Sequence, residues 1–99
     1  MVQFIEVLEE SYPTKPESRF KVREIYISPE HIVMVREDSN IQRTLSEGLA
    51  VIPGLSPTAK FSKLTVNRGT QGQDIVVAGS VEAVYEKINN VRSKQLLRG

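Results

Sequence analysis

The chain has 99 residues, of which 39% are hydrophobic and 25% are charged, and its formal net charge is +1. This length predicts a single domain over 1–99 with its own core, and the composition excludes a chain that is disordered throughout. The absence of cysteine excludes disulfides and thiolate metal sites, and the near-zero net charge indicates no particular class of partner.

The N-terminal part of the chain predicts two strands and a loop between them. Residues 2–8 and 20–27 are rich in β-branched and aromatic side chains, which favour strands. Residues 9–19 contain two prolines and predict a polar loop. The apolar phase of the second strand shifts between Val22 and Ile25, which predicts a β-bulge or a strong twist there.

A proline-containing turn leads into the third predicted strand. Ser28–His31 has its proline where a turn requires the φ angle that proline already has. Residues 32–35 are apolar on both faces, which predicts a strand in the interior of the sheet. The adjacent acids Glu37 and Asp38 follow this strand and are interpreted as solvated loop carboxylates.

The sequence specifies the structure of residues 38–59 least. Ile41 and Leu45 are four residues apart and Gly48 follows them, which predicts a short helix over 41–47. The apolar stretch after this helix contains two prolines. Because so long an irregular connection is unusual in a small domain, the stretch must either pack on the core or bind a partner.

The C-terminal part carries the clearest signals. Residues 61–67 and 74–78 predict two paired strands, because the glycines between them suit a hairpin turn. Ser80 is a suitable N-cap for a final helix. Four apolar residues of this helix recur at spacings of three and four, so they must face the sheet. This apolar stripe consists of Val81, Val84, Ile88 and Val91.

The predicted fold class is α+β, a small antiparallel β-meander of about five strands with a C-terminal α-helix packed on one face. In a meander, successive connections alternate between the two ends of the sheet. The turn at Ser28–His31 and the loop at 67–73 are therefore predicted at one end. The long segments 9–19 and 38–59 are predicted at the other end.

Two stretches resemble a known family. Residues 25–37 resemble the segment of small flagellar FlbD-like proteins in which an Asn/Ser-Pro turn joins two strands, and residues 77–88 resemble that family's closing strand and helix. The chain is also similar to uncharacterised sheet-plus-helix proteins of bacteria and bacteriophages. The resemblance implies the fold and a flagellar accessory role, and it implies no catalytic residue. The segments 9–19 and 38–59 depart from the family pattern.

No catalytic, cofactor or metal site is predicted. His31 is the only histidine, and the sequence offers neither the further ligands that zinc needs nor a serine partner for nucleophilic catalysis. Gly69 and Gly72 match the GxxG pattern of nucleic-acid-binding loops, but they lie between two predicted strands instead of two helices. We therefore expect a non-enzymatic interaction or accessory protein, encoded by a bacterium or a phage, without a cofactor.

A candidate partner-binding surface lies in the long segments, where apolar or amphipathic side chains are expected at the surface. These residues are Tyr12, Leu49, Val51, Ile52 and Leu55. The alternative is that 49–55 folds back to cover the sheet face that the helix leaves open. Unpaired edge strands and an uncovered sheet face further predict a homo-oligomer, and an unidentified protein partner is the other possibility.

A candidate basic patch forms if the fourth strand and the last helix share a face. Its residues are Lys60, Lys63, Arg68, Lys87, Arg92, Lys94 and Arg98. The low net charge and the lack of a stacking platform of aromatic side chains weigh against nucleic acid as a partner. A nucleic-acid-binding regulator and a minor structural component of a larger assembly are the alternative functions.

The sequence contains no signal-peptide pattern and no apolar stretch of membrane-spanning length. We therefore expect a soluble, cytoplasmic protein without a membrane partner.

Overall fold

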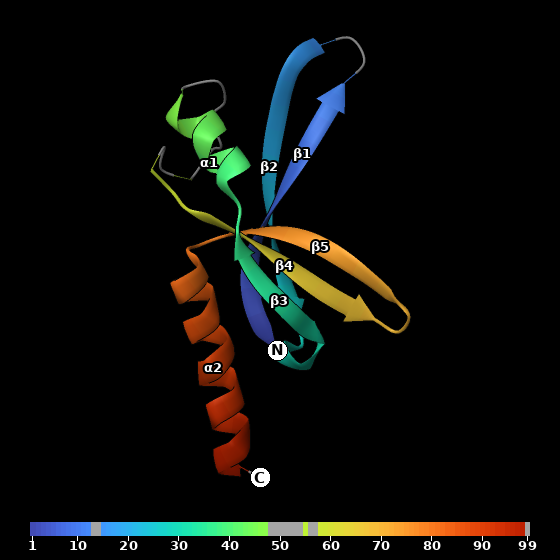
Figure 1. The fold of residues 1–99 in the computed structure, drawn as a ribbon, viewed down its shortest axis with the longest axis vertical. Helices are drawn as coiled ribbons and strands as arrows, with labels where there is room; N and C mark the ends of the chain where they lie inside the picture. Colours follow the sequence, from blue (N-terminus) through green and yellow to red (C-terminus); the bar gives the residue numbers. More distant parts are fainter. Residues whose placement is uncertain (13–14, 48–54, 56–57, 99) are drawn as a thin grey trace.

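Five strands form one antiparallel sheet, and a helix at the C-terminal end of the chain packs against it (Figure 1). The predicted α+β class, five strands with a C-terminal helix on the sheet, is confirmed. The computed structural model describes residues 1–12, 15–47, 55 and 58–98, with the backbone alone at 10–12, 15–19, 68 and 94–98. The strands are β1 (Val2–Tyr12), β2 (Lys15–Ile27), β3 (Ile32–Glu37), β4 (Phe61–Arg68) and β5 (Gln71–Ala78), and the helices are the 3-10 helix η1 (Pro29–His31), α1 (Ser39–Ser46) and α2 (Val81–Arg98).

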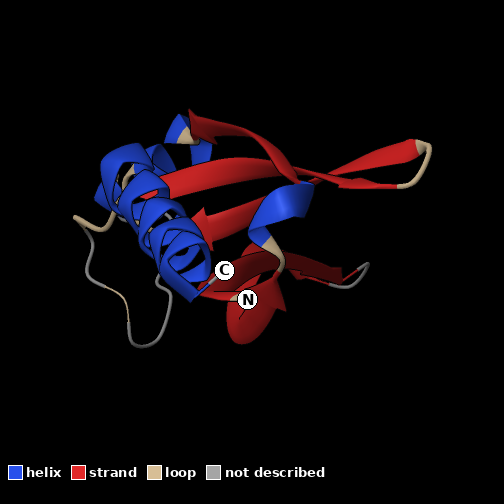
Figure 2. Ribbon diagram, turned by 90° about the horizontal axis from the view of Figure 1, so that it is seen from below, coloured by secondary structure: helices blue, strands red, loops and turns tan. Residues whose placement is uncertain are grey.

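The strand order is β2-β1-β5-β4-β3, which differs from a simple meander at one point. β2 and β3 follow each other in the chain but lie at opposite edges of the sheet, while β1 pairs with β5. Only Ser28 and η1 join these two edges, so the sheet must curl toward an incomplete barrel. Figure 2 shows the curled sheet from a direction close to the axis of α2.

The prediction of a loop over 9–19 is wrong. β1 continues to Tyr12 and β2 begins at Lys15, and these two residues are register partners, so the strands form one long hairpin. Pro16 lies within β2, which is an edge strand, and an edge strand tolerates a residue without an N–H on its open side. The candidate partner residue Tyr12 is therefore the last residue of a strand.

Of the two alternatives predicted between Val22 and Ile25, a β-bulge or a strong twist, the β-bulge is absent. The register runs without a break from the pair of Val2 and Ile27 to the pair of Glu10 and Arg19, and it shifts only between Glu10 and Tyr12. The change of apolar phase in β2 has a different cause. Phe20 packs against one hydrophobic core, whereas Ile25 and Ile27 pack against another on the opposite face of the sheet. The apolar side chains of β2 therefore change from one face to the other along the strand.

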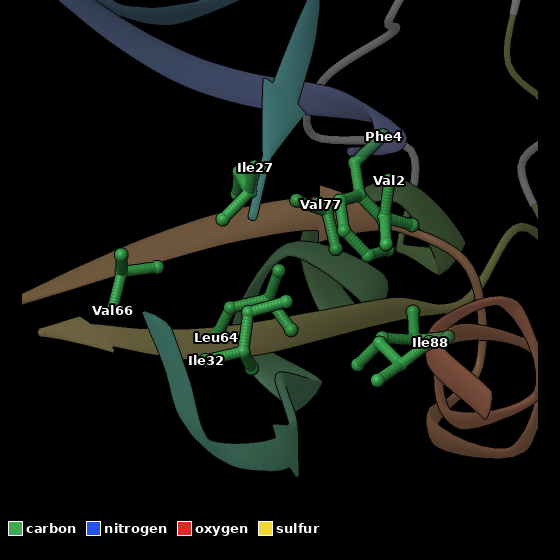
Figure 3. Packing of buried hydrophobic residues seen from close by; sticks show 9 residues of the cluster. Val2, Phe4, Ile27, Ile32, Leu64, Val66, Val77 and Ile88 are labelled. Carbon is green, nitrogen blue, oxygen red and sulfur yellow. The ribbon is translucent and has the colours of Figure 1, made fainter. Parts of the chain in front are cut away.

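The larger core, called here the first core, lies between the inner face of the curled sheet and α2, and Figure 3 shows eight of its residues labelled. Its buried residues are Val2, Phe4, Ile27, Ile32, Leu64, Val66, Val77, Val84 and Ile88. The second core lies where α1 packs near β1 and β4. Its buried residues are Val7, Leu45 and Phe61, with Phe20, Ile41, Leu55, Ala59, Val76 and Ala78 packed against them.

The short helix predicted over 41–47 is confirmed as α1, and its N-cap is Asp38. The Asp38 carboxylate accepts hydrogen bonds from the backbone N–H groups of Asn40, at 3.0 Å, and of Ile41, at 3.4 Å. Asp38 is buried, and Lys63 Nζ lies 3.9 Å from its other carboxylate oxygen. The interpretation of Asp38 as a solvated loop acid is therefore wrong, because the carboxylate is buried and its cap hydrogen bonds and Lys63 offset the cost of burying the charge.

The C-terminal elements agree with the prediction. β4 and β5 pair up to Arg68 and Gln71, and Gly69 has φ +65° at the turn position where a type II′ hairpin takes glycine. The Ser80 hydroxyl accepts a hydrogen bond from the Ala83 N–H at 3.1 Å, as an N-cap does. Val84 and Ile88 of α2 are 2% and 4% exposed within the first core.

The predicted grouping of the short turns is confirmed. Ser28 and His31 line one hollow together with Gly69 of the β4–β5 turn, so both turns lie at the same end of the sheet. α1 and Leu55 of the 38–59 segment pack with Phe20 of β2, toward the other end. Figure 1 shows α1 beside the β1–β2 hairpin and away from the β4–β5 turn.

Candidate functional site

The strand predicted in the interior of the sheet, 32–35, is instead the edge strand β3, and a groove separates it from α2. This β3–α2 groove has a volume of about 300 Å³. It is lined by Ile32–Val35 of β3 and by Val81, Tyr85, Ile88 and Arg92 of α2. The residues of α2 in the groove recur at spacings of four, three and four, so they form one stripe along the helix.

Much of the apolar surface in the groove is open to solvent. Val33 is 60% exposed, Met34 is 49% exposed and Tyr85 is 60% exposed. Val33 lies where the pairing of β3 with β4 shifts register, between Ile32 and Met34. Large apolar side chains that gather in a groove are typical of a surface that contacts another molecule.

The backbone of β3 has an open edge. The Asp38 N–H donates to the Phe61 carbonyl oxygen at 3.0 Å, and the pairs two and four residues before Asp38 in the register are Arg36 with Lys63 and Met34 with Thr65. Because hydrogen-bonded pairs alternate along an antiparallel ladder, Arg36 and Met34 direct their backbone groups toward β4. The N–H and C=O groups of Val35 and Glu37 therefore face away from β4, where none of the described strands pairs with β3.

The two ends of the groove carry opposite charges. At the start of β3, an Arg92 guanidinium nitrogen donates to the Pro29 carbonyl oxygen at 3.0 Å. At the end of β3, Glu37 and Glu82 line a smaller hollow together with Lys60. α2 and β3 therefore run in opposite directions along the groove, with one cation at one end and two carboxylates beside a lysine at the other.

The other edge of the sheet is less suited to strand addition. β2 contains Pro16 and exposes Lys21, Arg23 and Glu24, which are features that discourage pairing along an edge. Arg23 also forms an ion pair with the buried Glu6 of β1, with 2.7 Å between Arg23 Nε and Glu6 Oε1. We therefore regard β3 and not β2 as the interaction edge.

The predicted partner-binding residues do not belong to the groove. Leu55 packs against the second core, which supports the alternative prediction that this part of the 49–55 stretch covers the sheet. Tyr12 ends β1, and only its backbone is described. The other three candidates, Leu49, Val51 and Ile52, lie outside the described residues.

The structure separates the predicted basic patch onto different surfaces. Leu64 points into the first core, so the neighbouring Lys63 projects from the opposite face of β4, where it pairs with Asp38. Lys87 of α2 instead donates to the Gln3 carbonyl oxygen at 3.2 Å, with its Nζ 5.7 Å from the centre of the Phe4 ring.

Among the remaining basic candidates, Arg92 lies in the β3–α2 groove and Lys60 is exposed beside its acidic end. Arg68 ends β4 at the hairpin turn, and Lys94 and Arg98 lie in the last turns of α2, each described by its backbone alone. The basic residues with described side chains therefore do not form one surface.

The β3–α2 groove was not predictable from the strand patterns, although the sequence contains one signal for it. Val33 and Met34 are apolar, and so are their neighbours in the strand, which must pack on the core. A strand that is apolar on both faces is either an interior strand or an edge strand that binds a partner. The choice between these depends on the strand order, which local patterns do not contain.

Within the described residues, no cluster of three or more His, Asp or Glu side chains is arranged to hold a metal ion. No described helix is long and apolar enough to cross a membrane. Comparison of the chain with protein-family models, with curated proteins and with solved structures finds no match, so the resemblance to FlbD-like proteins stays a prediction.

Proposed function

We propose that this chain is a non-enzymatic interaction protein that binds an extended protein segment by adding it as a strand to β3, beside α2. The observation that carries the proposal is the coincidence of an open strand edge with an exposed apolar groove along the same strand. The edge supplies backbone donors and acceptors, which give affinity for any extended chain. The groove supplies side-chain contacts, which give specificity.

The dimensions of the groove suit this mode of binding. The six residues of β3 span about 20 Å at the rise of a β-strand. Residues 81–92 of α2 span about 17 Å at the rise of an α-helix. A segment added to β3 would therefore lie along the helix over most of the strand, and every second side chain would enter the groove.

The alternative of a nucleic-acid-binding regulator has less support. Such proteins place several cations on one surface, whereas the described cations here lie on separate faces and several have partners within the chain. A minor structural component of a larger assembly is compatible with strand addition, because such components commonly join their neighbours through strand edges.

A displayed library of unstructured peptides, selected for binding to the chain and followed by amide chemical shifts, tests this proposal. Selected peptides should shift the amides of Val35 and Glu37 most. Tyr85→Ala should weaken binding about tenfold or more, because exposed aromatic residues in a groove commonly contribute most of the binding energy.

Tyr26→Ala is the matched control, since Tyr26 of β2 is also 60% exposed but lies outside the groove. It should leave the affinity unchanged. Peptides that bind equally well to the Tyr85→Ala variant, or that shift amides away from β3 and α2, would contradict the proposal.

A further inference from the structure

We infer that the segment bound at this edge is β3 of a second copy of the chain, paired antiparallel about a two-fold axis at Val35. This inference rests on the proposed function, because it uses the same open edge and the same groove. It names the partner that the geometry and the charges of β3 fit best.

The alternation of backbone groups restricts how two copies can pair. Only residues that face the open edge can form hydrogen-bonded pairs across it, and Val35 and Glu37 are such residues. A two-fold axis at Val35 pairs this residue with itself in the second copy. The same register places Arg36 opposite Met34 and places Glu37 opposite Val33.

Two alternative registers, with the axis at Arg36 or at Glu37, are disfavoured by charge. A two-fold axis at Arg36 would place two guanidinium groups directly opposite each other. An axis at Glu37 would do the same with two carboxylates. Like charges in directly opposed positions destabilise a pair of strands. The register centred on Val35 is free of both clashes.

This register also brings opposite charges together across the interface. In the register, Glu37 is the partner of Ser62, whose side chain points to the face of β4 that carries the first core. The Glu37 side chain therefore lies on the same side of the sheet as α2. In the proposed pairing, the Glu37 carboxylate of one copy lies opposite Val33 of the second copy. Because Val33 and Arg92 line the same groove, this carboxylate lies at the Arg92 end of the second copy's groove. The two-fold axis creates this Glu37–Arg92 contact twice.

The apolar surface of the groove fits the same partner. Val33 and Tyr85 are each 60% exposed and line the groove beside α2, where the strand of the second copy would cover them. Met34 pairs with Thr65 and therefore lies on the opposite face of the sheet, where it would meet Arg36 of the second copy. Because α2 runs opposite to β3, the two copies of α2 would run antiparallel on one face of a continuous sheet. Isologous contacts of this kind close after two copies and leave no further edge at β3.

A pair of charge-reversal variants tests the inference by sedimentation equilibrium. In a dimer of the Glu37→Arg variant, each contact between positions 37 and 92 contains two cations. In a dimer of the Arg92→Glu variant, each of these contacts contains two carboxylates. Each variant alone should dimerise about tenfold or more weakly than the parent chain, because opposed like charges disfavour a partner.

An equal mixture of the two variants should regain the affinity of the parent. In the mixed dimer, the arginine introduced at position 37 of one variant meets the glutamate introduced at position 92 of the other, while the native Glu37 and Arg92 supply the second contact. Recovery on mixing also shows that both variants are folded, although Arg92→Glu loses the hydrogen bond to the Pro29 carbonyl oxygen. Variants that dimerise as the parent does, or a mixture that does not recover, would overturn the inference.

The state of the parent chain separates this inference from the proposed function. A parent that stays monomeric at high micromolar concentration, while displayed peptides still shift the amides of Val35 and Glu37, overturns the second copy as partner and leaves strand addition standing. A monomeric parent to which no selected peptide binds at β3 overturns both.

Discussion

Replacing Phe61 by alanine is expected to lower the free energy of unfolding by about 3–5 kcal/mol. Phe61 is 0% exposed and, with Val7 and Leu45, forms the second core beneath α1. Removing the ring would leave a cavity there, because only α1 and a few neighbouring side chains are available to fill it. This loss is a large part of the stability that a domain of this size has.

Chemical denaturation followed by circular dichroism measures the effect of Phe61→Ala. Lys60→Ala is the matched control, because Lys60 is the exposed neighbour of Phe61 and its replacement should change the stability by less than about 0.5 kcal/mol. A loss below about 1 kcal/mol for Phe61→Ala would mean that α1 and the sheet do not enclose this ring.

Replacing Ile88 by alanine should cost about 2–5 kcal/mol. Ile88 is 4% exposed and joins α2 to the first core, where it packs in the same cluster as Phe4 and Leu64. The loss combines the transfer free energy of the removed methyl and methylene groups with the cavity that they leave. Because Ile88 also lines the β3–α2 groove, the same variant should weaken association at the groove.

Thermal and denaturant unfolding of Ile88→Ala should be compared with those of Glu86→Ala, which changes an exposed residue of the same helix turn. If the two variants unfold at the same denaturant concentration, α2 does not pack on the sheet through Ile88. A loss of stability for Ile88→Ala but not for Glu86→Ala supports the packing of α2 on the sheet and the position of Ile88 at the base of the groove.

The C-terminal part of the fold was predictable because its signals are local. The Ser80 cap, the stripe that includes Val84 and Ile88, and the glycine at the β4–β5 turn each act within a few residues. Local signals of this kind specify where an element begins and which of its faces is apolar. They do not specify which strand becomes its neighbour.

The N-terminal hairpin was not predictable in full, because the sheet has a core on each face. Val2 and Phe4 of β1 pack in the first core, whereas Val7 packs in the second. A strand that serves two cores loses simple alternation, and for that reason the changed phase in β2 predicts a bulge or a strong twist. Pro16 further suggested a loop, although an edge strand accommodates it.

The candidate site depends on strand order and so was missed. The apolar residues of β3 predict an interior strand if the sheet follows the order of the chain, but the pairing of β1 with β5 moves β3 to an edge. Val33 and Met34 then become surface residues beside Tyr85 of α2. Leu55 shows the reverse case, since a residue predicted at a binding surface contributes to a core.

Exchange of the backbone amide hydrogens along β3 tests the role of its open edge most directly. In the dilute monomer, the amides of Val35 and Glu37 should exchange fast, whereas those of Met34 and Arg36, which face β4, should exchange slowly. When the chain associates or binds a selected peptide, exchange at Val35 and Glu37 should slow markedly while Met34 and Arg36 change little. If association or peptide binding occurs and the exchange at Val35 and Glu37 stays as fast as in the monomer, β3 is not the interaction edge.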